Sequence, residues 1–328
     1  MSPSTSKASA RAGYGKHWAH INEVSFVAGM RLLFFVFRVC GRWPFRLMLY
    51  PVLLWYMARN PAARAASIDY LAHLRAQHPQ LATPTGIGGA FRHFSAFGES
   101  LLDKMLLWGG LFPMDKITLH DNAALSRDIA AGRGGLMICT HLGNLELCRV
   151  MSRRHPQLKL TVLVHTKHAQ AFNQMLAQLD PASQLNLLQV TEMTPATAVL
   201  LAEKVARGEF VVIAGDRVPV SPHPRVAMAP FMGAAAPFPI GPYVLASLMD
   251  CPTYLLFSRR TREGAEICFE GFRERIQLPR KQRDQLLTEL AADYAARLEQ
   301  HCLQAPLQWF NFYDFWALPT PDSHHAPH

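Results

Sequence analysis

Short apolar runs alternate with amphipathic segments along most of the chain. Apolar runs of five or six residues predict β-strands at 135–140, 160–164, 185–190, 210–214, 253–258 and 265–269. Apolar positions that recur with a helical period predict helices at 62–77, 90–108, 122–131, 145–154, 169–179, 195–207, 239–249 and 281–300. Short strands separated by helices are typical of an α/β protein, so we expect a mainly parallel sheet flanked by helices.

The N-terminal part of the chain has a different pattern. Residues 24–57 are dense in Phe, Leu, Val and Trp, and they are interrupted by arginines 31, 38, 42 and 46. These arginines are spaced by seven, four and four residues, so they lie on one face of a helix. Trp43-Pro44 predicts a break between two helices. A basic stripe beside large apolar side chains suits helices that lie on an anionic membrane surface.

Two other interpretations of this segment stay open. The helices could pack on the rest of the protein with their arginines in solvent. A tilted span is the other possibility, with an arginine reaching back to the surface. The longest uncharged run, 47–58, is shorter than the roughly 20 residues of a full membrane span.

Charge divides the chain in the same way. The 328-residue sequence has a formal charge of +9, and residues 1–64 hold nine lysines and arginines against one acidic residue, Glu23. The rest is nearly neutral, which argues against a nucleic-acid partner. We expect a disordered N-terminus (1–16), membrane-associating helices (17–60), one catalytic domain (61–316) and a disordered tail (317–328).

The sequence lacks the familiar metal and nucleotide motifs. None of the six cysteines forms a C-x-x-C pair, which predicts reduced cysteines without a zinc site. H-E-x-x-H, G-x-x-x-x-G-K-[ST] and G-x-G-x-x-G are also missing. We therefore expect no metal and no cofactor.

Residues 134–146 carry the most informative chemistry. An apolar strand leads into His141, followed by Gly143, by Asn144 as a helix N-cap, and by Glu146 in the first helical turn. A carboxylate that orients an imidazole makes it a good general base toward a hydroxyl, so His141 and Glu146 are the predicted catalytic pair. The alternative is a turn histidine whose ring is satisfied by a backbone carbonyl.

Several blocks in order resemble a known family. His-Leu-Gly-Asn-Leu-Glu at 141–146 fits an H-x4-E motif. Four further blocks follow in order: a strand ending in Gly-Asp-Arg at 215–217, Pro-Phe-Met-Gly at 230–233, a proline followed by a strand at 250–256, and Gln308-Trp309. Over about residues 20–316 the chain resembles the lysophospholipid acyltransferase superfamily, in particular its late acyltransferases of lipid A biosynthesis. The resemblance implies a glycerol-3-phosphate acyltransferase-like α/β fold and catalysis by His141.

The resemblance further implies direct acyl transfer at the cytoplasmic face of a bacterial inner membrane. The donor would be an acyl thioester on acyl carrier protein, with coenzyme A as the second choice, and the acceptor a hydroxyl or amine of a lipid or glycolipid. No G-x-S-x-G elbow offers a serine for a covalent route. An acyl-thioester hydrolase and a non-catalytic lipid-binding or scaffold protein remain as alternatives.

Other residues are expected to bind substrate. Gly143 and Asn144 are among them, and backbone N–H groups at the helix start, 143–145, would stabilise the oxyanion. Asp216 and Arg217 would shape the acceptor or phosphate end of the site, unless they form a loop ion pair. Lys167 would supply the charge that relatives place on an arginine one position earlier, unless it is a solvated lysine.

The C-terminal run 308–316 departs from the family pattern. It is aromatic and slightly acidic where the family is basic. This difference favours an acceptor other than a bis-phosphorylated sugar, with an aromatic plug over the core as the plain alternative.

Overall fold

The computed structural model describes residues 32, 34–120, 122–147, 158–164, 186–189, 194–219 and 224–317. Contacts divide the chain into two units, Met1–Met48 and Leu49–His328. The expectations for residues 1–16, for the tail beyond 317, for a helix at 169–179 and for most of the helix at 145–154 lie outside the described residues.

Helices dominate the described part of the first unit. Residues 34–40 are helical, Gly41 turns the chain with φ +69°, and α2 (Trp43–Arg59) begins directly after the turn. The break predicted at Trp43-Pro44 is therefore confirmed. Within the described residues, no helix combines the length and the hydrophobicity that crossing a membrane requires.

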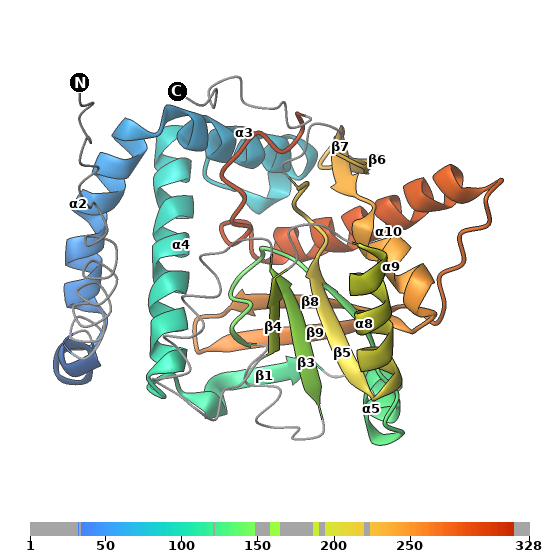
Figure 1. Cartoon of the computed structure of the whole chain (residues 1–328). Helices are drawn as coiled ribbons and strands as arrows, with labels where there is room; N and C mark the ends of the chain where they lie inside the picture. Colours follow the sequence, from blue (N-terminus) through green and yellow to red (C-terminus); the bar gives the residue numbers. More distant parts are fainter. Residues whose placement is uncertain are drawn as a thin grey trace, which may run out of the picture. The chain divides into compact units, whose positions relative to one another are not determined.

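A seven-stranded sheet forms the centre of the second unit (Figure 1). Its order among the described strands is β1 (Ile117–His120), β9 (Ala265–Arg273), β8 (Thr253–Arg260), β2 (Gly135–Cys139), β5 (Glu209–Ala214), β3 (Lys159–Val164) and β4 (Asn186–Gln189). Neighbours are parallel except β8 and β9, which pair antiparallel. The predicted mainly parallel sheet is confirmed.

Helices flank this sheet, with α8 lying beside β5 (Figure 1). They are α3 (Pro61–Gln77), α4 (Gly86–Trp108), α5 (Ala123–Ala130), α8 (Pro195–Ala206), α9 (Gly241–Met249) and α10 (Arg283–Gln304), with short 3₁₀ turns at Pro79–Leu81 and Met114–Lys116. Alternate residues of β2 and β5 pack with α8, α9 and α10 in one buried core. The predicted helices and strands therefore agree with the observed ones to within a few residues wherever the structure describes them.

Three strands were not predicted. β1 is a four-residue edge strand, too short for a clear alternation. β6 (Val226–Phe231) and β7 (Ala234–Pro239) form a separate hairpin rich in Ala and Pro, residues with low strand propensity. Met232 and Gly233, both with positive φ, make its two-residue turn. The helix predicted at 239–249 follows the hairpin and begins at Gly241.

Two features of this architecture create the site. β2 and β5 are parallel neighbours with Cys139 opposite Ala214, so the residues that follow these two strands meet at one edge of the sheet. The C-terminal segment then crosses the same edge. It pairs with the loop after β2 through Gly143 N–H to Gln308 O (2.8 Å) and Phe310 N–H to His141 O (2.9 Å).

Candidate active site

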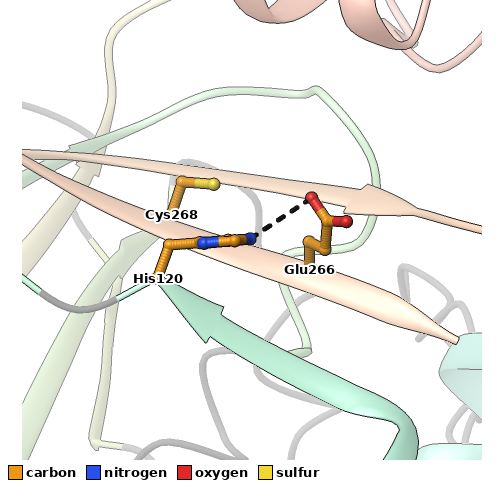
Figure 2. Close-up of side chains that lie close together, drawn as sticks. All are labelled: His120, Glu266 and Cys268. Carbon is orange, nitrogen blue, oxygen red and sulfur yellow. Dashed lines mark ion pairs between the residues drawn. The ribbon is translucent and has the colours of Figure 1, made fainter.

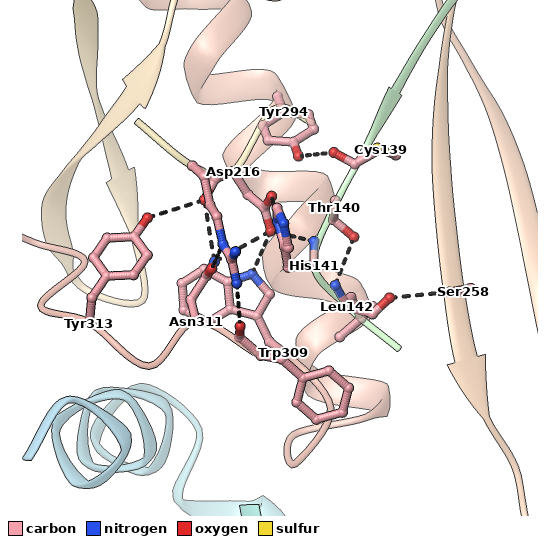
Figure 3. Close-up of polar contacts among 12 residues, drawn as sticks. Cys139, Thr140, His141, Leu142, Asp216, Ser258, Tyr294, Trp309, Asn311 and Tyr313 are labelled. Carbon is pink, nitrogen blue, oxygen red and sulfur yellow. Dashed lines mark hydrogen bonds and ion pairs between the residues drawn. The ribbon is translucent and has the colours of Figure 1, made fainter. Parts of the chain in front are cut away.

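His141 and Asp216 form the centre of the site (Figure 3). His141 follows β2 and Asp216 follows β5, and Nδ1 of His141 lies 2.7 Å from Oδ1 of Asp216. The backbone N–H of His141 also donates to Oδ2 of Asp216 at 2.7 Å. The imidazole is thus fixed through its Nδ1 edge, and its Nε2 makes no hydrogen bond to any described residue.

Asp216 is fully buried, whereas the His141 side chain keeps 24% of its surface exposed. Burial alone would raise the pKa of the Asp216 carboxyl. The charge of the adjacent imidazolium and the hydrogen bonds from the ring and backbone of His141 outweigh burial and hold that pKa below its ordinary value. A carboxylate that stays ionised keeps the proton of a neutral His141 on Nδ1, which leaves Nε2 as the basic nitrogen.

The position of Glu146 corrects the predicted pairing. Glu146 was expected to orient His141, but its carboxylate lies 3.3 Å from Nζ of Lys104 on α4, and Asp216 occupies the Nδ1 edge of the imidazole. The reason is strand order, because β5 lies directly beside β2 and brings Asp216, two residues past the end of β5, next to His141, two residues past the end of β2.

Residues of the C-terminal segment complete the shell around Asp216. Trp309 Nε1 donates to Oδ2 of Asp216 at 2.9 Å, and Asn311 Nδ2 lies 3.3 Å from the Asp216 carbonyl oxygen. Tyr313 reaches the same carbonyl at 3.5 Å. Trp309 is fully buried, so the aromatic run acts as a plug that also positions the carboxylate (Figure 3).

Arg217 contacts this segment rather than an acid. Its Nε donates to Oδ1 of Asn311 and its guanidinium to the carbonyl of Phe310, both at 2.8 Å. The alternative of an Asp216–Arg217 loop ion pair is therefore not what the structure shows. Arg217 ties the loop after β5 to the C-terminal segment.

The loop after β2 uses most of its backbone donors internally. Gly143 has φ +68°, and a Cβ there would overlap the carbonyl oxygen of Ser258, which explains the glycine. Its N–H donates to Gln308, and the Asn144 N–H donates to Oγ of Ser258 at 3.0 Å. These two N–H groups are therefore not available for an oxyanion, contrary to the prediction for Gly143 and Asn144.

Asn144 nevertheless has a donor to offer. Its Oδ1 accepts from the N–H of Glu146 at 3.0 Å, as an N-cap does, while its buried Nδ2 has no acceptor among the described residues. Asn144 borders a cavity of about 90 Å³ next to the loop, together with Gly143, Ser100, Arg260 and Phe310. Lys167, the remaining predicted site residue, lies outside the described residues.

His93 on α4 supports the site from behind. Nε2 lies 2.9 Å from the carbonyl oxygen of Trp309 and Nδ1 lies 2.9 Å from Oγ of Ser67. Because a carbonyl can only accept, Nε2 carries the proton and Nδ1 accepts from the serine hydroxyl. Sequence reasoning missed His93, although a polar residue on the apolar face of 90–108 was a usable signal. Trp309 was noted as part of a family-like block, but no role at the site was predicted for it.

Acid should weaken this arrangement. Burial lowers the pKa of His93 to about 4, against the opposing effect of the Trp309 carbonyl. An unfolded histidine titrates near 6.5, so the unfolded chain gains a proton between roughly pH 6.5 and 4 while the folded chain does not. The free energy of unfolding is therefore highest above pH 6.5, and it falls by about 3 kcal/mol by pH 4.

Urea unfolding from pH 4 to 7.5 measures this loss directly. A His93→Gln variant keeps a donor for Trp309 but cannot titrate, so its free energy of unfolding should depend less steeply on pH. Equal slopes for the two proteins would show that His93 is not the group responsible.

The arrangement as a whole provides one basic nitrogen, Nε2 of His141, in a fixed tautomer at the carboxyl ends of the parallel strands β2 and β5. Such a nitrogen can take a proton from a hydroxyl or amine and return it to a leaving group. The residues that could hold a metal ion in the described part of the chain lie elsewhere, on β1 and β9.

Comparison with known proteins agrees with this chemistry. A family model for bacterial lipid A biosynthesis acyltransferase matches residues 114–317, which include both His141 and Asp216. None of the curated proteins compared with the chain matches it.

Proposed function

Because the chain belongs to the bacterial lipid A biosynthesis acyltransferase family and is therefore an acyltransferase acting on lipids, we propose that it moves an acyl chain from a thioester to a hydroxyl or amine of a membrane lipid or glycolipid. The donor is acylated carrier protein, or else acyl-coenzyme A. The reaction takes place at the cytoplasmic face of the bacterial inner membrane.

In the proposed mechanism His141 acts as the general base. Nε2 removes the proton from the acceptor as its oxygen or nitrogen attacks the thioester carbonyl. Collapse of the tetrahedral intermediate forms the ester or amide bond and breaks the C–S bond, and the imidazolium returns the proton to the leaving thiolate. Asp216 keeps the ring oriented and stabilises the imidazolium.

One observation carries this proposal. The only hydrogen bond that the His141 ring makes to a described residue is the 2.7 Å contact of Nδ1 with the buried Asp216. A plain structural histidine in a turn would have its ring satisfied by a backbone carbonyl. Here a carboxylate orients the ring and the opposite nitrogen is left for substrate.

Asn144 is the proposed oxyanion or carbonyl donor. The residue borders the cavity, and its Nδ2 is buried with no acceptor in the part of the chain that the structure describes. A buried amide donor is costly to leave unpaired. A substrate carbonyl would supply the missing partner. Lys167 is proposed to supply positive charge for the acceptor, and Arg217 to act on the acceptor end of the site mainly through its contacts with the C-terminal segment.

Membrane association is proposed for the N-terminal helices. Large apolar side chains of the first unit are exposed, among them Phe35, Val39, Trp43 and Leu47, and they alternate with Arg38, Arg42 and Arg46. This combination suits a helix at an anionic interface, where each arginine contributes about 1 kcal/mol.

Vesicle binding tests that proposal. Replacing Arg38, Arg42 and Arg46 by Gln should lower the partition constant for anionic vesicles by about a hundredfold, since about 3 kcal/mol of attraction is lost. The control removes the same charge from exposed positions elsewhere, Arg262, Arg280 and Lys281, and should bind as wild type does. Equal losses in both variants would mean that only net charge matters.

Acyl transfer itself can be measured with purified protein. Acylated carrier protein or acyl-coenzyme A is incubated with a bacterial lipid extract, and products are identified by mass spectrometry. We expect a lipid heavier by one acyl group, formed only when extract is present. Thioester cleavage at the same rate without extract would instead support a hydrolase, and binding of lipid without product would support a scaffold.

A further inference from the structure

A second group of reactive side chains lies away from His141, at the edge of the sheet. His120 ends β1, and Glu266 and Cys268 lie on β9, with one possible ligand atom of each within 4.8 Å of the other two. In Figure 2 the sulfur, the imidazole nitrogen and the carboxylate point toward one another. β8 separates β9 from β2, the strand that leads to His141.

Backbone register places these three side chains together. His120 is directly opposite Cys268 in the parallel β1–β9 pair, and Glu266 lies two residues before Cys268 on the same strand. Residues two apart on a strand share a face. The intervening Ile267 is fully buried on the other face, so the strand cannot turn without losing core contacts.

The donor types favour one class of ion. Imidazole nitrogen, thiolate sulfur and carboxylate oxygen are the three ligands that Zn²⁺ takes in proteins, whereas Mg²⁺ and Ca²⁺ prefer oxygen alone. Three protein ligands leave the fourth tetrahedral position to water. His120, whose side chain is 52% exposed, gives an ion access from solvent.

Arg259 on β8 helps to orient the Glu266 carboxylate and does not block it from binding an ion. Its Nε donates to Oε2 of Glu266 at 2.7 Å, and Nε2 of His120 lies 3.5 Å from that same oxygen. Oε1 takes no part in these contacts with Arg259 and His120 and is available as a ligand. Ligating carboxylates are commonly held by a hydrogen-bonding partner of this kind, which fixes their orientation.

We propose that His120, Glu266 and Cys268 form a binding site for a single zinc-class divalent ion, with water as the fourth ligand. The ion cross-links the short edge strand β1 to β9. Local sequence motifs could not show this site, because its ligands are far apart in the chain. The simpler alternative is an ion-pair group of His120, Glu266 and Arg259 that binds no metal.

Cobalt titration of the full-length, chelator-treated protein distinguishes the two. Co²⁺ bound to a cysteine thiolate gives a charge-transfer band in the near ultraviolet and visible bands of a tetrahedral site, and Zn²⁺ should displace it. We expect one equivalent of Co²⁺ to produce the band. Removal of the sulfur in Cys268→Ser should abolish it, and His120→Ala should weaken binding by at least about tenfold.

Matched controls keep the test decisive. Cys40→Ser removes an exposed cysteine of the first unit, and replacing His324, His325 and His328 by Ala removes the histidines of the tail. Both variants should keep the band. The proposal is overturned if no thiolate band appears, if Cys268→Ser retains it, or if it disappears with Cys40 or the tail histidines.

Thermal unfolding gives a readout independent of spectroscopy. Zn²⁺ should raise the melting temperature of the wild type, because a ligand of the folded state stabilises it by mass action. His120→Ala, at an exposed side chain, should fold normally and lose this shift. Retention of the full shift in His120→Ala would also overturn the proposal.

Discussion

Replacement of His141 by Asn is expected to lower the rate of acyl transfer by a factor on the order of 10²–10⁴, the usual contribution of a general base. The Asn amide occupies the position of Nδ1, so it can donate to Asp216 as the imidazole does, while the basic Nε2 is lost. Fold and membrane binding should therefore stay as in the wild type. Transfer rates with purified protein measure the effect, and circular dichroism checks the fold.

A second variant and a cellular readout make this prediction sharper. His141→Ala also removes one of the donors to the buried Asp216 carboxylate, so it should be equally inactive and less stable. In cells, the lipid product seen with wild type should be missing with His141→Asn. Wild-type rates in a folded His141→Asn protein would rule out His141 as the base.

The sheet could be predicted from sequence because its central strands are short apolar runs between helices. β2, β5 and β8 are buried along nearly their whole length, and such strands stand out by composition alone. The antiparallel pairing of β8 and β9 was not foreseen, although only residues 261–264 connect them, a length typical of a hairpin. The hairpin of β6 and β7 was missed because Ala and Pro carry little strand signal.

The site was predicted in its parts but not in its pairing. His141 and Asp216 were both identified as polar residues at strand ends. Nearness in sequence then favoured Glu146 as the partner, whereas nearness in space depends on which strands are neighbours. Strand order is a property of the whole sheet, so no local pattern around residue 141 could have revealed the contact with Asp216.

The contribution of the C-terminal segment follows from the same principle. Trp309 is buried, its backbone carbonyl accepts from His93, and its indole N–H donates to Asp216. The aromatic run could equally be read as a substrate wall or as a plug. The structure shows that one tryptophan packs the core and also fixes the catalytic carboxylate, so packing and positioning are not separate alternatives here.

Asp216→Asn should cost nearly as much activity as loss of His141 itself, on the order of 10²–10⁴. The amide oxygen of the new Asn side chain would accept from the indole N–H of Trp309 and from the backbone N–H of His141. Its NH₂ group would then face Nδ1 of the His141 ring. Nδ1 must then accept, which moves the ring proton to Nε2 and blocks the base. Because Glu146 contacts Lys104 instead, Glu146→Gln should lower the rate much less.

Non-additivity separates this positioning role from a general loss of structure. If Asp216 acts through His141, Asp216→Asn should cause no further loss of rate in a protein that already carries His141→Asn, since residues that act as a unit fail together. A damaged fold would instead lower the residual rate again. Only the group that holds the imidazole loses its effect on the rate once the imidazole is gone. If Glu146→Gln gave the large, non-additive loss of rate and Asp216→Asn the small one, the orienting carboxylate would therefore be Glu146.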